Sequence, residues 1–115
     1  MSFVLRQIAQ RAGGGEIVRT RELTAAEPVI GRGADADIQL GDLAVSLRHA
    51  RLRMTGPGRV EVEALGPTGF ELDGEEVARA ELKPADGPVV GFGSYRLALS
   101  AQGDDVVVTV SRDET

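Results

Sequence analysis

Turn-forming residues recur throughout this 115-residue chain, which contains 15 glycines and five prolines. The apolar segments between them are short and rich in Val, Ile and Leu, which is typical of strands. Residues 77–82 are compatible with a helix but too few to form one alone, and no segment shows a helix of three turns. Many short strands joined by Gly and Pro turns predict an all-β sandwich or barrel.

We expect about eleven short strands, mainly antiparallel, with no substantial helix. In residues 49–54, Ala50, Leu52 and Met54 alternate with polar residues, which indicates a strand with one buried face. Asp73-Gly74 suits a type I′ hairpin turn. The predicted strands are 2–9, 16–23, 28–30, 38–40, 49–54, 60–65, 70–72, 81–82, 89–92, 94–99 and 105–110.

Length and charge limit the possible classes of protein. A chain of 115 residues is large enough for one core, so we expect a single domain. The net charge of −5 and the lack of a basic stripe argue against a nucleic-acid partner. No apolar run approaches the ~18 residues of a membrane span, so we expect no membrane insertion. The absence of cysteine is consistent with a cytoplasmic protein.

The segment from Gly31 to His49 carries the most specific chemistry. Two turn-rich stretches, 31–37 and 41–48, flank the short apolar run 38–40. The first stretch supplies Arg32, and the second supplies Ser46 and Arg48. Arginines and a hydroxyl on neighbouring loops suit a bound phosphate, because a guanidinium can bind two oxyanion oxygens at once. The alternative is a pair of surface loops that carry arginine and bind no ligand.

The sequence supports catalysis and metal binding less well than phosphate binding. His49 is the only histidine, and the pair Ser46 and His49 has no evident orienting acid or oxyanion hole. A lone histidine at the start of a strand more often braces loops through hydrogen bonds. No calcium-binding loop pattern is present, so we expect neither metal nor cofactor, and solvated acidic faces explain the clustered carboxylates of Asp35, Asp37, Asp42, Glu61 and Glu63.

The order and spacing of several motifs resemble the forkhead-associated (FHA) domain, a family of eleven-stranded β-sandwiches that bind phosphothreonine peptides through loops at one end. The resemblance covers residues 28–100. The motifs that carry it are Gly31-Arg32, Asp37-Ile38-Gln39-Leu40, Val45-Ser46-Leu47-Arg48-His49-Ala50 and Gly69-Phe70-Glu71-Leu72-Asp73-Gly74. Because FHA-like domains are commonly parts of larger chains, the resemblance also implies that residues 1–115 can be one domain excised from a larger protein, with a boundary near Thr115.

The resemblance implies a role for ten residues. Arg32 and Ser46 correspond to phosphate contacts, with Arg48 as an auxiliary cation. A second group would contact the peptide, and a third would hold the loops in place. The peptide-contacting group is Leu47, Thr68 and Gly69, and the structural group is Gly31, His49, Asp73 and Gly74.

Three positions depart from the family pattern. Leu47 stands where a basic or polar residue often follows the serine. Thr68 replaces an asparagine whose amide grips the peptide backbone on both sides of the phosphothreonine, and a threonine hydroxyl cannot supply both ends of that amide. Pro67 replaces a Ser or Thr that assists the phosphate. The first interpretation is therefore a non-catalytic phosphothreonine-recognition module, and the alternative is an FHA-like scaffold that makes phosphate-independent protein contacts.

Overall fold

Strands make up most of residues 2–112, the part of the chain that the computed structural model describes. The first six are β1 (Phe3–Gln10), β2 (Glu16–Leu23), β3 (Val29–Gly31), β4 (Ile38–Gln39), β5 (Ala50–Gly56) and β6 (Arg59–Ala64). The next six are β7 (Phe70–Leu72), β8 (Glu75–Val77), β9 (Arg79–Leu82), β10 (Val89–Phe92), β11 (Tyr95–Gln102) and β12 (Asp105–Arg112). The boundary expected near Thr115 lies outside the described residues.

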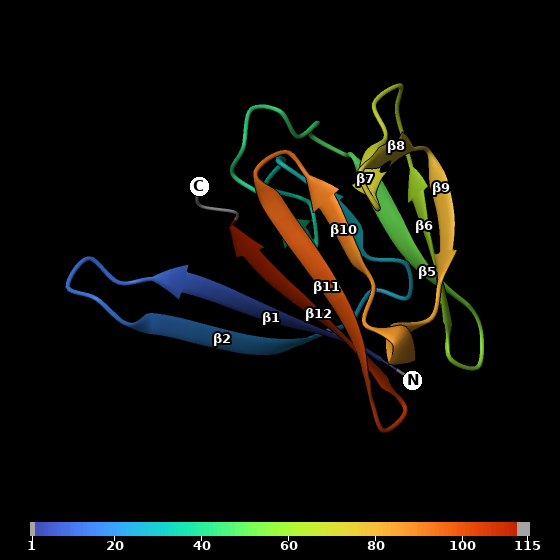
Figure 1. The fold of residues 1–115 in the computed structure, drawn as a ribbon, viewed down its shortest axis with the longest axis horizontal. Helices are drawn as coiled ribbons and strands as arrows, with labels where there is room; N and C mark the ends of the chain where they lie inside the picture. The colour runs from blue at the N-terminus through green and yellow to red at the C-terminus, as the bar shows by residue number, and fades with distance from the viewer. Residues whose placement is uncertain (1, 113–115) are drawn as a thin grey trace.

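The strands form two sheets (Figure 1). The larger sheet has the order β2-β1-β12-β11-β10-β7-β8, and the smaller has the order β4-β3-β5-β6-β9. Most neighbouring strands are antiparallel, whereas β1 with β12 and β3 with β4 are parallel. Within residues 2–112 the helical structure is one 3-10 turn, η1 (Pro84–Asp86), and no helix there is long and apolar enough to cross a membrane. The predicted all-β sandwich is therefore confirmed.

The core lies between the sheets and follows the alternation of the sequence. In β5, Ala50 and Leu52 are fully buried, while Arg51 and Arg53 point to the other face. The rings of Phe70 and Phe92 stack at a centroid distance of 5.6 Å near the end of the sandwich where β10 turns into β11. Because the chain has few aromatic residues, most of the remaining core consists of Val, Leu and Ile.

Residues 73–82 require a correction to the predicted strands. The prediction placed a strand only at residues 81–82, whereas β8 and β9 together cover residues 75–77 and 79–82. Asp73 and Gly74 have φ angles of 53° and 83°, and a type I′ turn requires positive values at both positions. This turn folds β8 back onto β7 with Leu72 opposite Glu75. The sequence of β8 has no alternation of its own, so its strand conformation depends on the turn and on β7.

The outer face of the smaller sheet corrects a second expectation. Glu61, expected on a solvated acidic face, is only 4% exposed because two arginines cover it. Arg53 donates to its Oε1 at 2.9 Å and Arg79 to its Oε2 at 2.8 Å. These hydrogen bonds lower the pKa of Glu61, with that from Arg79 the largest cause. The alternating charges of β5, β6 and β9 therefore form a cross-strand network rather than separate solvated groups.

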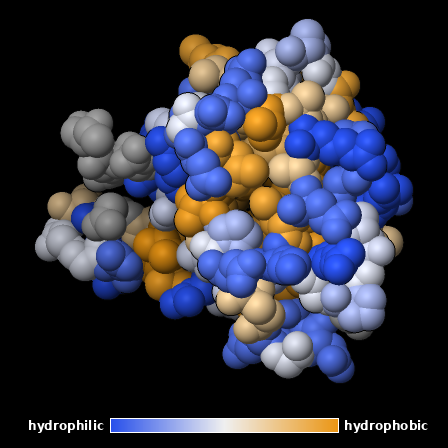
Figure 2. Space-filling view, turned by 45° about the vertical axis from the view of Figure 1, so that its right-hand side comes forward, coloured by the Kyte–Doolittle hydropathy of each residue, from blue (hydrophilic) through white to orange (hydrophobic). Residues whose placement is uncertain are grey.

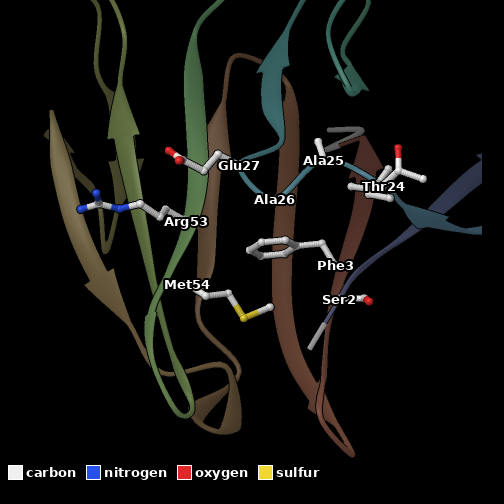
Figure 3. A pocket seen from close by; sticks show the side chains of 9 residues that line it. Ser2, Phe3, Thr24, Ala25, Ala26, Glu27, Arg53 and Met54 are labelled. Carbon is white, nitrogen blue, oxygen red and sulfur yellow. The ribbon is translucent and has the colours of Figure 1, made fainter.

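A pocket of about 520 Å³ opens between the sheets where the segment from β2 to β3 crosses from one sheet to the other. Phe3 and Met54 point toward one another across it, while the side chain of Arg53 points away (Figure 3). On the face shown in Figure 2, hydrophilic residues cover most of the surface and leave only small apolar areas between them. Residues of β1, β2, β5 and the segment from β2 to β3 line this pocket, and it shares no lining residue with the predicted site.

Candidate functional site

The segment between β4 and β5, residues 41–48, and the adjoining His49 are hydrogen-bonded to three other connections at one end of the sandwich. The backbone amide of Arg32, directly after β3, donates to the carbonyl oxygen of Ser46 at 2.9 Å. The ring of His49 contacts the backbone of Gly69, which lies between β6 and β7. The carboxylate of Asp42 contacts Ser94 in the turn between β10 and β11. Residues far apart in the sequence are thereby held in one cluster of loops.

Arg32 is half-buried and its guanidinium is held at one edge only. Its Nε donates to the carbonyl oxygen of Val45 at 3.1 Å, which fixes the plane of the guanidinium against the 41–48 segment. Among residues 2–112, the terminal nitrogens of Arg32 have neither an ion pair nor a further hydrogen bond. Asp37, a possible partner, instead accepts a hydrogen bond from the amide of Val29 at 2.9 Å. The positive charge of Arg32 is therefore not neutralised within the described chain.

Ser46 is also fixed through its backbone. Its amide donates to Nδ1 of His49 at 3.0 Å, and its carbonyl accepts the bond from Arg32. Its hydroxyl has no hydrogen-bond partner among residues 2–112. Leu47 and Arg48 follow on the surface, with Leu47 56% exposed and the Arg48 side chain unpaired within the same range.

His49 connects two loops through both ring nitrogens. Because Nδ1 accepts the Ser46 amide proton, Nε2 carries the hydrogen and donates to the carbonyl oxygen of Gly69 at 2.7 Å. The ring is 2% exposed and packs edge-on against Phe92 at a centroid distance of 5.2 Å. Both nitrogens are thus used by backbone groups, and neither faces the hydroxyl of Ser46 as a general base would.

Asp42 performs a positioning role that the sequence analysis missed. Its Oδ1 accepts the amide of Ala44 at 2.9 Å, and its Oδ2 accepts both the hydroxyl of Ser94 at 2.6 Å and the amide of Ser94 at 2.8 Å. These bonds, the Ser94 hydroxyl first, lower the pKa of Asp42 from 3.8 to about 2. An Asx turn from Asp42 to Ala44 is a local signal that could have been found. The partner Ser94, 52 residues away, left no such signal.

Thr68 and Gly69 lie between β6 and β7, where the carbonyl oxygen of Gly69 is the hydrogen-bond partner of His49. Thr68 is exposed, and Gly69 lines a pocket of about 240 Å³ together with His49 and Thr68. A Cβ atom at Gly69 would overlap the carbonyl oxygen of Val77, so this position excludes a side chain. Gly31 is restricted in the same way by the carbonyl oxygen of Leu47. Both glycines allow neighbouring backbones to approach closely.

The cluster can bind an anion. One guanidinium with two free terminal nitrogens and one free hydroxyl lie on loops whose backbones are hydrogen-bonded to each other, and these groups match the oxygens of a phosphate. Asp73 and Gly74 lie farther along the chain, in the turn after β7. An all-β sandwich with such loops at one end defines a class of loop-based recognition domains.

Comparison with known proteins identifies the family. Residues 29–93, more than half of the chain, match the family model of the FHA domain. The chain is 31% identical over 81 residues to the FHA domain-containing protein FhaA of Mycobacterium tuberculosis; this covers 70% of the chain but only 15% of FhaA. The chain therefore belongs to the FHA family, as the sequence motifs predicted.

Solved structures agree with this assignment. One, from a study of phosphothreonine-dependent FHA domain interactions, has a TM-score of 0.64 and 30% identity, with 89% of this chain and 98% of that chain covered. The FhaA FHA domain complexed with the intracellular domain of Rv3910 has a TM-score of 0.55 and 33% identity, with 78% and 91% covered. The FHA domain of CT664 from Chlamydia trachomatis shares the fold, with a TM-score of 0.67, 21% identity, and 90% and 100% covered.

Proposed function

We propose that this FHA domain recognises phosphothreonine in a partner protein and that Arg32 and Ser46 bind the phosphate. The observation that carries the proposal is that the terminal nitrogens of Arg32 and the hydroxyl of Ser46 are both free within residues 2–112, on two loops joined by the Arg32–Ser46 backbone bond. A charge-assisted hydrogen bond contributes about 1.5–3 kcal/mol, and a phosphate offers enough oxygens for several.

The other predicted residues take supporting roles in this proposal. Arg48 is an auxiliary cation that approaches the phosphate from solvent. Leu47, Thr68 and Gly69 face the peptide on either side of the phosphothreonine. Gly31 and His49 keep the phosphate-binding loop against its neighbours through the close approach to Leu47 and the two ring hydrogen bonds. Asp73-Gly74 supports the site indirectly, by folding β8 onto β7.

The proposed activity is binding without catalysis. A serine nucleophile that a histidine activates needs a nitrogen of that histidine within hydrogen-bond distance of its hydroxyl. Both nitrogens of His49 are instead bonded to the backbone of Ser46 and Gly69, in a ring that is almost completely buried.

A phosphate-independent scaffold is the second candidate function, and Pro67 and Thr68 favour it. Pro67 has neither a hydroxyl nor a backbone N–H to offer a phosphate, and the Thr68 hydroxyl is shorter than the asparagine amide of the family pattern. Such a scaffold would retain the fold but would lack the hydrogen bonds that hold the peptide backbone.

Binding to a degenerate phosphothreonine peptide library, beside its unphosphorylated twin at physiological salt, separates the two functions. We expect selective binding of the phosphorylated library, and Arg32→Ala should weaken it by about 2–5 kcal/mol if the charge pair is desolvated. Arg59→Ala is the matched control, because Arg59 pairs with Glu81 on the outer face of the smaller sheet. Equal binding of both libraries, or an unchanged affinity in Arg32→Ala, would contradict the proposal and favour the scaffold.

A further inference from the structure

We propose that a groove beneath the β1–β2 ribbon binds an acidic, partly apolar segment that flanks the phosphothreonine in the same partner protein. This inference rests on the proposed function and extends the interface beyond the phosphate-binding loops.

The ribbon is the hairpin of β1 and β2, whose outer end projects from the sandwich. Strand β1 pairs with β12 only from Phe3 to Gln7, whereas it pairs with β2 as far as Gln10. Residues 8–10 and 16–18 therefore form a two-stranded extension, seen as the long blue hairpin in Figure 1. An isolated two-stranded hairpin is only marginally stable in water, so contact with a further chain would stabilise it.

One face of the ribbon covers a groove of about 290 Å³. Ile17 and Arg19 alternate on that face of β2, in register with Ala9 and Gln7 of β1. Val110 of β12 and Tyr95 of β11 continue the lining on the same face of the larger sheet, where Val110 is in register with Gln7, and Gln39 of β4 also lines the groove. The groove thus combines an apolar lining with one cation, which suits an extended segment that carries both apolar and acidic side chains.

The groove is continuous with the proposed phosphate-binding loops. Gln39, which lines the groove, donates from its Nε2 to the carbonyl oxygen of Arg32 at 3.3 Å. Arg21, on the same face of β2 as Arg19, donates to the carbonyl oxygen of Asp37 at 3.0 Å, in the loop that begins with Arg32. A peptide bound at Arg32 can therefore continue into the groove along Gln39.

The distribution of paired and unpaired arginines indicates the sign of the charge on the expected ligand. On β5 to β11, arginines are paired with glutamates: Arg51, Arg53, Arg59, Arg79 and Arg96, whereas Arg112 of β12 lies over the ring of Tyr95. In the β1–β2 hairpin and the proposed phosphate-binding loops, arginines lack a carboxylate partner among residues 2–112: Arg6, Arg11, Arg19, Arg21, Arg32 and Arg48. Of these, Arg19 and Arg21 lie on the groove face of β2, whereas Arg6 lies on the other face of β1. The first 23 residues hold four arginines and two glutamates, a net +2 within a chain of net charge −5. These unpaired cations are complementary to an acidic segment.

Peptides of different length test this inference. A short degenerate phosphothreonine library is compared with long libraries that extend it, on the amino or the carboxyl side, by a tract of aspartate and leucine. We expect the acidic tract on one side to raise the affinity of the full chain about tenfold at physiological salt. Arg19→Glu should abolish that gain and leave the affinity for the short library unchanged.

Two further variants control the experiment. Lys83→Glu makes the same change in charge near η1, away from the ribbon, and should keep the gain. Ile17→Asn removes part of the apolar lining and should reduce the gain without changing the affinity for the short library. If the short library binds but no long library binds better, or if Arg19→Glu retains the gain, the inference is wrong while the proposed function stands. If the short library also fails to bind, the proposed function fails first and this inference with it.

Discussion

The motif resemblance assigns Thr68, between β6 and β7, to a position at which the family pattern has an asparagine. An amide presents a donor and an acceptor to the two sides of a peptide backbone, whereas a hydroxyl on a shorter side chain reaches one side. Because Thr68 is exposed, an asparagine fits there without repacking the core. We therefore expect Thr68→Asn to raise the affinity for a phosphothreonine library about tenfold, by roughly one or two added hydrogen bonds.

Titration of the same library into Thr68→Asn and Thr68→Val checks this expectation. The valine variant keeps the shape of threonine and removes the hydroxyl, so it reports what the natural residue contributes. No gain in the asparagine variant would mean that the peptide does not pass Thr68, and the assignment of residues 67–69 to the peptide would have to be abandoned.

Asp42 makes the stability of the loop cluster dependent on pH. Its pKa is about 2 in the folded protein against 3.8 ordinarily, because Ser94 and the Ala44 amide donate hydrogen bonds to the ionised carboxylate. A pKa that is lower in the folded state stabilises the protein fully above the unfolded value, and this contribution is lost as the pH falls from about 4 to about 2. Asp42→Asn removes the titrating group.

We expect the free energy of unfolding of the natural chain to exceed that of Asp42→Asn above about pH 4, and the difference to shrink toward pH 2. Denaturant unfolding across this range measures it. Asp35→Asn is the control, because Asp35 is an exposed carboxylate at the same end of the sandwich and makes no hydrogen bond within residues 2–112. A difference that stays constant with pH would show that the Asp42 carboxylate does not titrate in the way its bonds to Ser94 require.

At the scale of elements, the proposed phosphate-binding loop depends on how closely β3 approaches the 41–48 segment. Gly31 ends β3, and a Cβ atom there would overlap the carbonyl oxygen of Leu47. The hydrogen bonds of Arg32 and Gly33 to Ser46 and Leu47 require this approach. We expect Gly31→Ala to displace the loop and to destabilise the fold by about 1–3 kcal/mol, as overpacking does.

Thermal or denaturant unfolding, together with peptide affinity, measures both effects of Gly31→Ala. The control is Gly56→Ala at the end of β5, where no atom lies within 4 Å of the added Cβ and φ is not positive. Weaker peptide binding in Gly31→Ala alone is the expected result. Similar stability and affinity in the two variants would indicate that the 41–48 segment moves aside without cost.

For the whole molecule, the features that could be predicted from the sequence are those that neighbouring residues determine. Period-2 alternation identified the β5–β6 hairpin, and the Asp73-Gly74 pair identified the type of the β7–β8 turn, because each depends on neighbouring residues. The family assignment followed from the order of motifs between Gly31 and Gly74 and is confirmed. The ligand-contacting roles of Arg32 and Ser46 remain predictions, although the structure brings the two residues together.

The features that could not be predicted from the sequence depend on contacts between residues far apart in the chain. Strand β8 exists because a turn returns it to β7, and its own sequence carries no strand pattern. Glu61 alternates like a solvent-facing residue, and only the side chains of Arg53 and Arg79 from two neighbouring strands bury it. The contact of Asp42 with Ser94 spans 52 residues. Side-chain pairs between elements cannot be read from one sequence until the register of the strands is known.

The inward face of β5 permits the clearest test of the sandwich as a whole. Ala50 is fully buried, and its neighbour along the chain, His49, holds the loops together. Ala50→Asp would place an unpaired carboxylate in the core, and a buried charge without a partner costs about 3–5 kcal/mol or more. That cost is comparable with the total stability of a small domain, about 5–15 kcal/mol. We therefore expect Ala50→Asp to unfold, as measured by circular dichroism, while Thr55→Asp, exposed on the same strand, stays folded. If Ala50→Asp were as stable as the natural chain, β5 would have to present its other face to the core. The charged side chains of Arg51 and Arg53 would then be buried among apolar residues.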